Sequence, residues 1–184
     1  DAYWKAMFYN KCALNEVATV APTYLDYVQP MFDHDVPAEV ENAGQLYRAL
    51  LEGHKEIKLL NDIQVNRTLY VTEDTVIYSD SDCTITRAHD FGGDIFVVGE
   101  DSQGNGVSKG ADLTLGKDGN NALLIIDGNE ANMTVDVTGR VFRVVGASEL
   151  NILAQAEINN NKLMASDGIG GSVALIGEDG KMSV

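Results

Sequence analysis

Hydrophobic residues follow two different periods along this chain, and the change falls near residue 57. Before that point they recur at steps of three and four, which is typical of an amphipathic helix. One such stretch contains Tyr3, Trp4, Met7, Phe8, Leu14 and Val17, and a second contains Leu46, Ala49 and Leu50. Gly53 is well placed to end the second helix, because glycine readily takes the left-handed conformation found there. We predict a helical N-terminal segment over 1–43, with a polar connector around Pro37, and a short helix over 44–53.

After residue 57 the helical period disappears and short apolar runs take its place. They are rich in Val, Ile, Leu and Thr and are bounded by Gly, Asn, Asp or Ser, which is typical of strands. No helix-length pattern interrupts them, so alternating strand–helix units are disfavoured and an essentially all-β region is expected. The runs are IKLLNDIQV, TLYVTEDTVIY, CTITRA, DIFVVG, ADLTLG, ALLIIDG, MTVDVTG, VFRVVGA, LNILAQA and SVALIG.

Some of these runs resemble one another. LGKDG at Leu115–Gly119 is similar to IGEDG at Ile176–Gly180, and FVVGEDS, RVVGASE and ALIGEDG align through their glycines with offsets of 47 and 31 residues. Such irregular spacing favours a solenoid, in which insertions occupy loops. A sandwich or barrel is the alternative. The lack of long hydrophobic–polar alternation and of tight hairpin spacing argues against it.

The segment LNILAQAEINNNKLMASDGIGGSVALIGEDGKM carries a family resemblance. It is similar to repeats of right-handed parallel β-helix proteins of the pectate-lyase-like superfamily, closest to adhesin-like bacterial surface members. The matching positions are Ile158, Asn161, the loop Lys162–Ile169, Gly170–Gly171 and the strand Ser172–Ile176. The resemblance implies a mainly β fold over 44–184: a right-handed parallel β-helix (solenoid) with a capping helix at 44–53.

A solenoid exposes an apolar end unless something caps it. The helix at 44–53 would cover the N-terminal end, whereas the chain stops at GEDGKMSV in the middle of a repeat. We therefore expect a β-helix truncated at its C-terminal end, with further domains of a longer parent chain; the alternative is that the last strands are covered in some other way.

Charge, apolar run length and cysteine content limit the kinds of partner and the thiol chemistry that we expect. The formal net charge of the 184 residues is −15, which repels nucleic-acid phosphates, so we expect no nucleic-acid partner. No run of apolar residues is long enough to span a bilayer, so we expect no membrane insertion. Cys12 and Cys83 lie far apart, and we expect two small buried thiols, with a single disulfide as the alternative in a secreted protein.

The densest polar cluster is SDSDCTITRAHDFGGD. As a ligand site it would use Arg87, His89, Asp90 and Asp94 to bind sugar hydroxyls or uronates, while Asp80 and Asp82 would offer carboxylates to a cation. The alternative, which we favour, is a solvated strand edge and loop with Arg87 paired to a neighbouring aspartate.

Three acidic loops, GEDSQGNG, GKDGNNA and IDGNEAN, raise the same question of metal binding. Asp101 in the first of them joins Asp80 and Asp82 as a candidate metal ligand. None of the loops has the twelve-residue calcium pattern, and turn chemistry accounts for their Asp-Gly pairs. We therefore expect no cofactor, with Ca²⁺ as the alternative.

The long loop Glu100–Gly110 interrupts the strands, and such loops often carry binding function.

No catalytic residues can be assigned, because the chain lacks a Gly-His-Gly segment and any nucleophile–base arrangement of recognisable spacing. The resemblance implies a non-catalytic region of a secreted or cell-surface bacterial protein. It would act as an adhesive, glycan-contacting module or a rigid stalk, with polysaccharide or host or cell-surface glycan as partner. The alternative is a fragment of a carbohydrate-active enzyme of the same fold, a polysaccharide lyase or glycoside hydrolase.

Overall fold

The computed structural model describes residues 36–163 and 173–184. The chain divides into two units, Asp1–Val36 and Pro37–Val184, and everything below concerns the second. The helix expected over the first 20 residues, Cys12, and the Gly170–Gly171 part of the repeat lie outside the described residues. Within the predicted segment 1–43, the structure has a strand, β1 (Ala38–Val40), in place of a helix or connector. β1 forms because it pairs with β2, a partner that no local pattern reveals.

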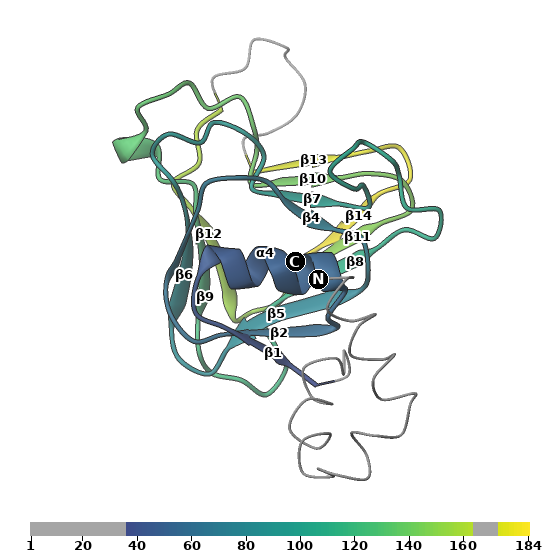
Figure 1. Ribbon diagram of the computed structural model, residues 1–184, viewed down its shortest axis with the longest axis horizontal. Coiled ribbons are helices and arrows are strands. Elements are labelled where there is room, and N and C mark those ends of the chain that lie inside the picture. Colours follow the sequence, from purple (N-terminus) through teal and green to yellow (C-terminus); the bar gives the residue numbers. More distant parts are fainter. Residues whose placement is uncertain (1–35, 164–172) are drawn as a thin grey trace, which may run out of the picture. The chain divides into compact units, whose positions relative to one another are not determined.

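Parallel strands arranged in three sheets make up this unit (Figure 1). From β2 onward the chain moves from sheet A to sheet B to sheet C and back to A, so each full pass places one strand in every sheet. Sheet A is β1, β2 (Glu56–Leu59), β5 (Thr75–Ser79), β8 (Asp112–Leu115), β11 (Glu149–Ile152) and β14 (Lys181–Ser183). Sheet B is β3 (Ile63–Val65), β6 (Cys83–Arg87), β9 (Leu124–Asp127) and β12 (Ala156–Asn159). Sheet C is β4 (Leu69–Val71), β7 (Phe96–Val98), β10 (Phe142–Val144) and β13 (Ala174–Ile176).

The register places similar apolar side chains above one another at many inner positions of the sheets. In sheet B the partners are Ile63, Ile85, Ile126 and Ile158, one from each pass. The first three of these are at most 2 % exposed. Neighbouring strands lie about 4.8 Å apart, so identical branched side chains fill the space between passes without voids. The same order holds in sheet C, where the rings of Phe96 and Phe142 stack with centroids 5.5 Å apart.

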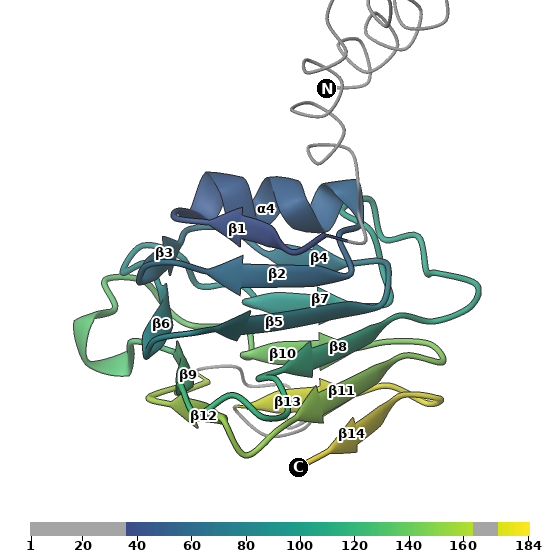
Figure 2. The same ribbon diagram turned by 90° about the horizontal axis from the view of Figure 1, so that it is seen from below.

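Helix α4 (Ala43–Glu52) lies across one end of this core (Figure 2). The side chain of Asn42 accepts a hydrogen bond from the Gln45 N–H at 3.0 Å, and Gly53 ends the helix with φ of 73°. The helix contacts β1, β3 and β4, so it touches the first strand of each sheet. Its buried residues are Leu46, Ala49 and Leu50, as the apolar stripe predicted.

The glycine alignment of the sequence locates neighbouring strands but differs from the structural register by one residue. Gly99 and Gly177 directly follow β7 and β13, whereas Val145 follows β10 and Gly146 comes one residue later. The three strands are neighbours in sheet C. The similarity of Leu115–Gly119 to Ile176–Gly180 is not structural, because the first begins in sheet A and the second in sheet C. Turn chemistry alone makes these two segments alike.

Two strand predictions were wrong. MTVDVTG, residues 133–139, forms no strand; a 3-10 helix, η2 (Glu130–Asn132), and an irregular loop occupy this region. Its apolar residues alternate, but only Val137 among Met133, Val135 and Val137 is buried, because no neighbouring strand is there to pair with it. Conversely, the polar end of the chain forms β14, which pairs with β11. The unit is thus mainly β with parallel sheets and is consistent with a β-solenoid-like fold.

The stacked isoleucines of sheet B predict that substitutions at two adjacent positions of β9 have unequal effects on the free energy of unfolding. Replacing Ile126 by Ala should lower the free energy of unfolding by about 2–5 kcal/mol, because it leaves a cavity between passes. Ile125 is the matched control, since it is half-buried on the opposite face of the same strand. Urea unfolding of both variants tests the assignment, and a loss for Ile125→Ala equal to that for Ile126→Ala would contradict it.

Candidate functional site

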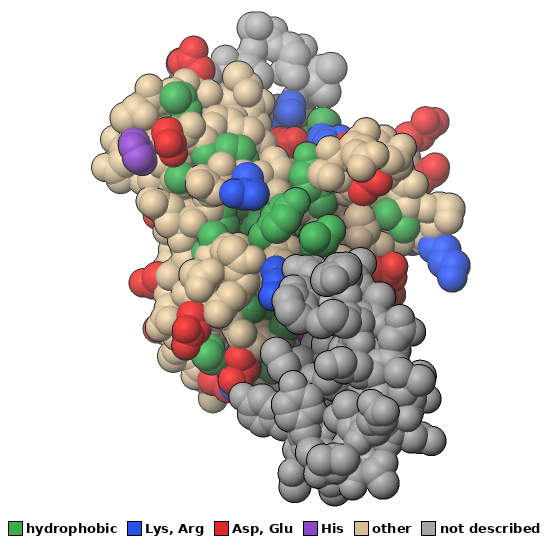
Figure 3. Space-filling view, in the orientation of Figure 1, with side chains coloured by type: hydrophobic (Ala, Val, Ile, Leu, Met, Phe, Trp, Pro, Cys, Tyr) green, Lys and Arg blue, Asp and Glu red, His purple; other side chains and the backbone are tan. Residues whose placement is uncertain are grey.

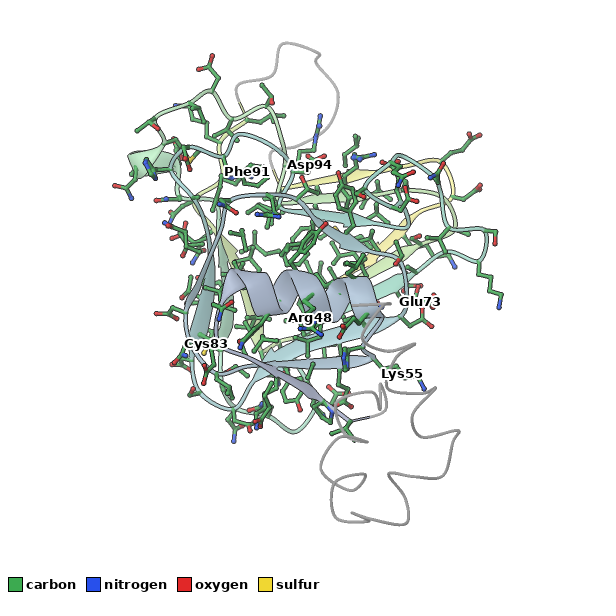
Figure 4. All side chains as sticks on the ribbon, in the orientation of Figure 1. Arg48, Lys55, Glu73, Cys83, Phe91 and Asp94 are labelled. Atoms are coloured by element: carbon green, nitrogen blue, oxygen red, sulfur yellow. The ribbon has the colours of Figure 1, made fainter. Side chains whose placement is uncertain are left out.

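Three loops protrude where the chain passes from sheet B to sheet C. They comprise residues 88–94 after β6, 128–140 after β9, and 160–162 after β12, and we call them the loop cluster. Phe91 and Asp94 mark its base in Figure 4. The cluster contains three of the seven polar sequence candidates, His89, Asp90 and Asp94, and most of one of the three acidic loops, IDGNEAN.

Arg87 joins the three loops from beneath. It is the last residue of β6, faces the core, and is fully buried. Its Nη1 donates to the carbonyl oxygens of Phe91 and Gly93 in the first loop. Its Nη2 donates to the carbonyl oxygen of Arg140 in the second loop at 3.2 Å and to Oδ1 of Asn161 in the third loop at 3.0 Å. A single side chain therefore bonds to loops from three successive passes, to the backbone of the first two and to the side chain of Asn161 in the third.

Burial lowers the pKa of Arg87, an effect that the nearby negative charge of Asp94 opposes. Arginine nonetheless stays protonated in proteins, so the site contains a buried cation. The ring of Phe91 lies 5.6 Å from the guanidinium carbon and screens it. The expected pairing of Arg87 with an aspartate was wrong: within the described residues its hydrogen bonds go to carbonyl and amide oxygens. The planar fork of arginine fits several separate acceptors at once.

The first two loops are also bonded directly to each other. The Thr134 N–H donates to the carbonyl of His89 at 2.8 Å. The N–H groups of Thr138 and Gly139 donate to the carbonyl of Gly92 at 2.9 and 2.8 Å. A Cβ atom on Gly139 would overlap the backbone of residues 93 and 94, so this close approach requires glycine.

A hollow of about 480 Å³ opens beside this contact. Amides, carboxylates and aliphatic groups line it together: Asp127, Asn129, Glu130, Ala131, Asn132, Met133, Val135, Asp136, Val137, Asn160 and Lys162. The volume lies within the range of small-molecule sites. Acidic and apolar side chains lie side by side where the loop cluster protrudes in Figure 3.

Buried bonds fix the wall of the hollow. Asn129, which takes a left-handed conformation with φ of 59°, donates from Nδ2 to the carbonyl of Arg87 at 2.8 Å. Its Oδ1 accepts from Nδ2 of Asn132 at 2.6 Å. Lys162 lies 3.5 Å from Glu130 across the opening. The hollow is therefore connected through Asn129 to the arginine that organises the loops.

The residues that the sequence suggested for ligand binding do not form one site in the structure. His89 and Asp90 are exposed, 4.0 Å apart, and do not line the hollow. Asp94 accepts from the Arg140 N–H at 2.7 Å and from Nε of Arg143 at 3.0 Å. Arg143 in turn binds both carboxylate oxygens of Glu100, and chiefly this contact raises the pKa of Arg143. Asp94 thus ties the loop cluster to the start of the long loop Glu100–Gly110.

Several aspartates at the ends of strands share one role that the sequence did not suggest. The carboxylate of each accepts a backbone N–H from the next pass of the chain. The pairs are Asp62 with Thr84, Asp74 with Asp112, Asp82 with Leu123, and Asp94 with Arg140. Asp82 and Asp94 therefore stabilise the stacking of passes.

The other two metal candidates also have bonded carboxylates. Asp80 lies 3.2 Å from Lys58 on sheet A. Asp101 accepts from the N–H groups of Gln103 and Asn105 and from Nδ2 of Asn105, which closes the turn at the start of the long loop. Across residues 36–163 and 173–184, no group of three or more His, Cys, Asp or Glu side chains could hold a metal ion. Cys83 is a free, buried thiol, as expected.

Sequence reasoning considered the IDGNEAN part of the lining only as a metal site, and it missed the lining residues Met133, Val135, Asp136 and Val137 because it assigned 133–139 to a strand. One pattern could have located them: the longest offset in the glycine alignment, 47 residues, spans this insertion. Polar residues in an insertion between strands are a better guide to a site than polar residues within a strand.

Comparison of the chain with protein-family models, curated proteins and solved structures finds no match. In the part of the chain that the structure describes, no helix has both the length and the apolar composition needed to cross a membrane.

Removing the buried guanidinium should loosen all three loops together. We expect Arg87→Met to lower the free energy of unfolding by about 3 kcal/mol, because the carbonyl groups of Phe91, Gly93 and Arg140 lose their donor. Hydrogen exchange should quicken at the amides of Thr134 and Gly139, which bond between loops.

Arg67→Met is the matched control. Arg67 is exposed and stacks on Tyr47 with 5.3 Å from its guanidinium carbon to the ring centroid, so its loss should cost at most about 1 kcal/mol. Unchanged exchange in the loop cluster of Arg87→Met would contradict the role given to Arg87.

The turn at Asp101 predicts a pH dependence. Hydrogen bonds, first from the side chain of Asn105 and then from backbone N–H groups, hold the pKa of Asp101 below its ordinary value of 3.8. The stabilisation is therefore complete above pH 3.8 and is lost as the pH falls through the lowered pKa. In an NMR titration, the amides of Gln103 and Asn105 should shift together with a midpoint below 3.8, and Asn105→Ala should raise it. A wild-type midpoint at or above 3.8 would exclude this arrangement.

Proposed function

We propose that Pro37–Val184 is a right-handed parallel β-helix that serves as a non-catalytic, glycan-contacting module of a secreted or cell-surface bacterial protein. In this proposal the sheets form a rigid support and the loop cluster makes the contact. Polysaccharide or a cell-surface glycan is the partner.

The β-helix assignment is supported by the order of the strands. Each sheet takes every third strand from β2 onward, and all pairs between these strands are parallel in the described residues. The stacked isoleucines and α4 at one end fit the same architecture.

The hollow of the loop cluster is the observation that carries the functional proposal. Sugars present hydroxyl groups that both donate and accept hydrogen bonds, and they also present apolar C–H faces. Asn132 and Asn160 offer amides that can satisfy both kinds of hydroxyl bond. Met133 and Val135 offer aliphatic surface beside them. Arg87 and Asn129 preorganise the wall, which reduces the entropy lost on binding.

A pair of asparagine variants tests this function. We expect Asn132→Ala to weaken binding of the tightest ligand from a panel of oligosaccharides by about tenfold, because it removes an amide from the hollow. Asn121→Ala is the control, since Asn121 is also exposed but lies between β8 and β9, outside the hollow. Calorimetry measures affinity, and chemical-shift changes locate the site. Absence of binding across the panel, or equal losses for both variants, would reject the proposal.

One observation favours a second function, glycoside hydrolysis. Register pairs Asp112 with Glu149 on adjacent strands of sheet A, and Asp74 bonds to the Asp112 N–H. Burial, followed by the charges of Asp74 and Glu149, raises the pKa of Asp112, which suits a general acid. Strands about 4.8 Å apart place two carboxylates near the spacing of retaining glycosidases. Release of reducing ends by wild type, but not by Asp112→Asn, would favour this function over binding alone.

A further inference from the structure

The charge of the hollow restricts which glycan fits it. Among the described residues, the lining contains three carboxylates, Asp127, Glu130 and Asp136, and one cation, Lys162. Lys162 is already close to Glu130 at 3.5 Å, so its charge is largely balanced. Oδ1 of Asp127 accepts from the Asn129 N–H at 2.8 Å.

Asp136 remains available to a ligand. It is exposed at the hollow, and its carboxylate makes no ion pair or hydrogen bond with another residue of the described ranges. A carboxylate in this position attracts a protonated amine and repels a carboxylate or sulfate. The formal charge of −15 on the whole chain adds a field of the same sign.

The aliphatic part of the lining argues against a simple inorganic cation. Met133 is half-buried and Val135 is 42 % exposed, and both face a volume of about 480 Å³, much larger than an ion needs. Such a surface suits the C–H face of a ring, while the amides of Asn132 and Asn160 suit its hydroxyl groups.

We propose that the hollow binds a hexosamine residue through its protonated amine, with Asp136 as the principal partner, and that it rejects uronic acids. This inference rests on the glycan-contacting function proposed above. It specifies the ligand class that the function leaves open.

Three oligosaccharides of equal length test the charge preference: a chitosan oligomer with free amines, the N-acetylated chitin oligomer, and an oligogalacturonate. In mildly acidic buffer the amines are protonated while most carboxylates remain ionised. We expect affinity to fall from chitosan to chitin to oligogalacturonate. Asp136→Asn should weaken chitosan binding by about fivefold and leave chitin binding unchanged.

A cationic oligomer also binds acidic proteins without a site, so a control of equal charge is needed. Asp179→Asn provides it, because Asp179 is exposed between β13 and β14 and lies outside the hollow. We expect it to change chitosan affinity by less than about twofold, as for a distant screened charge. Equal effects of the two variants would overturn the inference, as would tightest binding of oligogalacturonate in the hollow. The latter result would leave the glycan-contacting function intact, whereas failure of all three oligomers to bind would reject both.

Discussion

Backbone pairing between successive passes of the chain is the constraint on which the rest of this structure depends. Parallel strands in register place residue on residue at a fixed spacing, so many inner positions repeat an apolar side chain from pass to pass. Ile63, Ile85, Ile126 and Ile158 occupy one such position. The loops are free to differ in length because they lie outside the pairing. A regular core and irregular loops are two consequences of the same constraint.

Arg87 lies at the boundary between the regular core and the irregular loops. Arg87 is the register partner of Val65 on the neighbouring strand of sheet B, so a cation occupies an inner position that suits an aliphatic residue. Burying it is acceptable because loops from three passes supply oxygen atoms around the guanidinium. The position of the hollow is therefore coupled to the interior of the sheets through Arg87 and Asn129.

The acidity of the chain has a structural part and a part that faces solvent. Asp62, Asp74, Asp82 and Asp94 accept backbone N–H groups between passes, so each replaces a missing partner at the end of a strand. Asp136 has no such role among the described residues and borders the hollow. Aspartates of equal charge therefore have different roles in this structure, and composition alone does not tell a structural aspartate from one that faces solvent.

The sequence by itself determined the elements that depend on local pattern. The apolar stripe and Gly53 defined α4, the bounded Val- and Ile-rich runs located most strands, and the aligned glycines identified neighbouring strands of sheet C. Tertiary structure alone decided what depends on a distant partner. β1 is a strand because of β2, residues 133–139 are not a strand because they meet an irregular loop where a partner strand would be needed, and Arg87 bonds to loops from three passes instead of a nearby aspartate. Local pattern encodes backbone preference and burial, whereas pairing and buried hydrogen bonds require groups that the fold brings together from far along the chain.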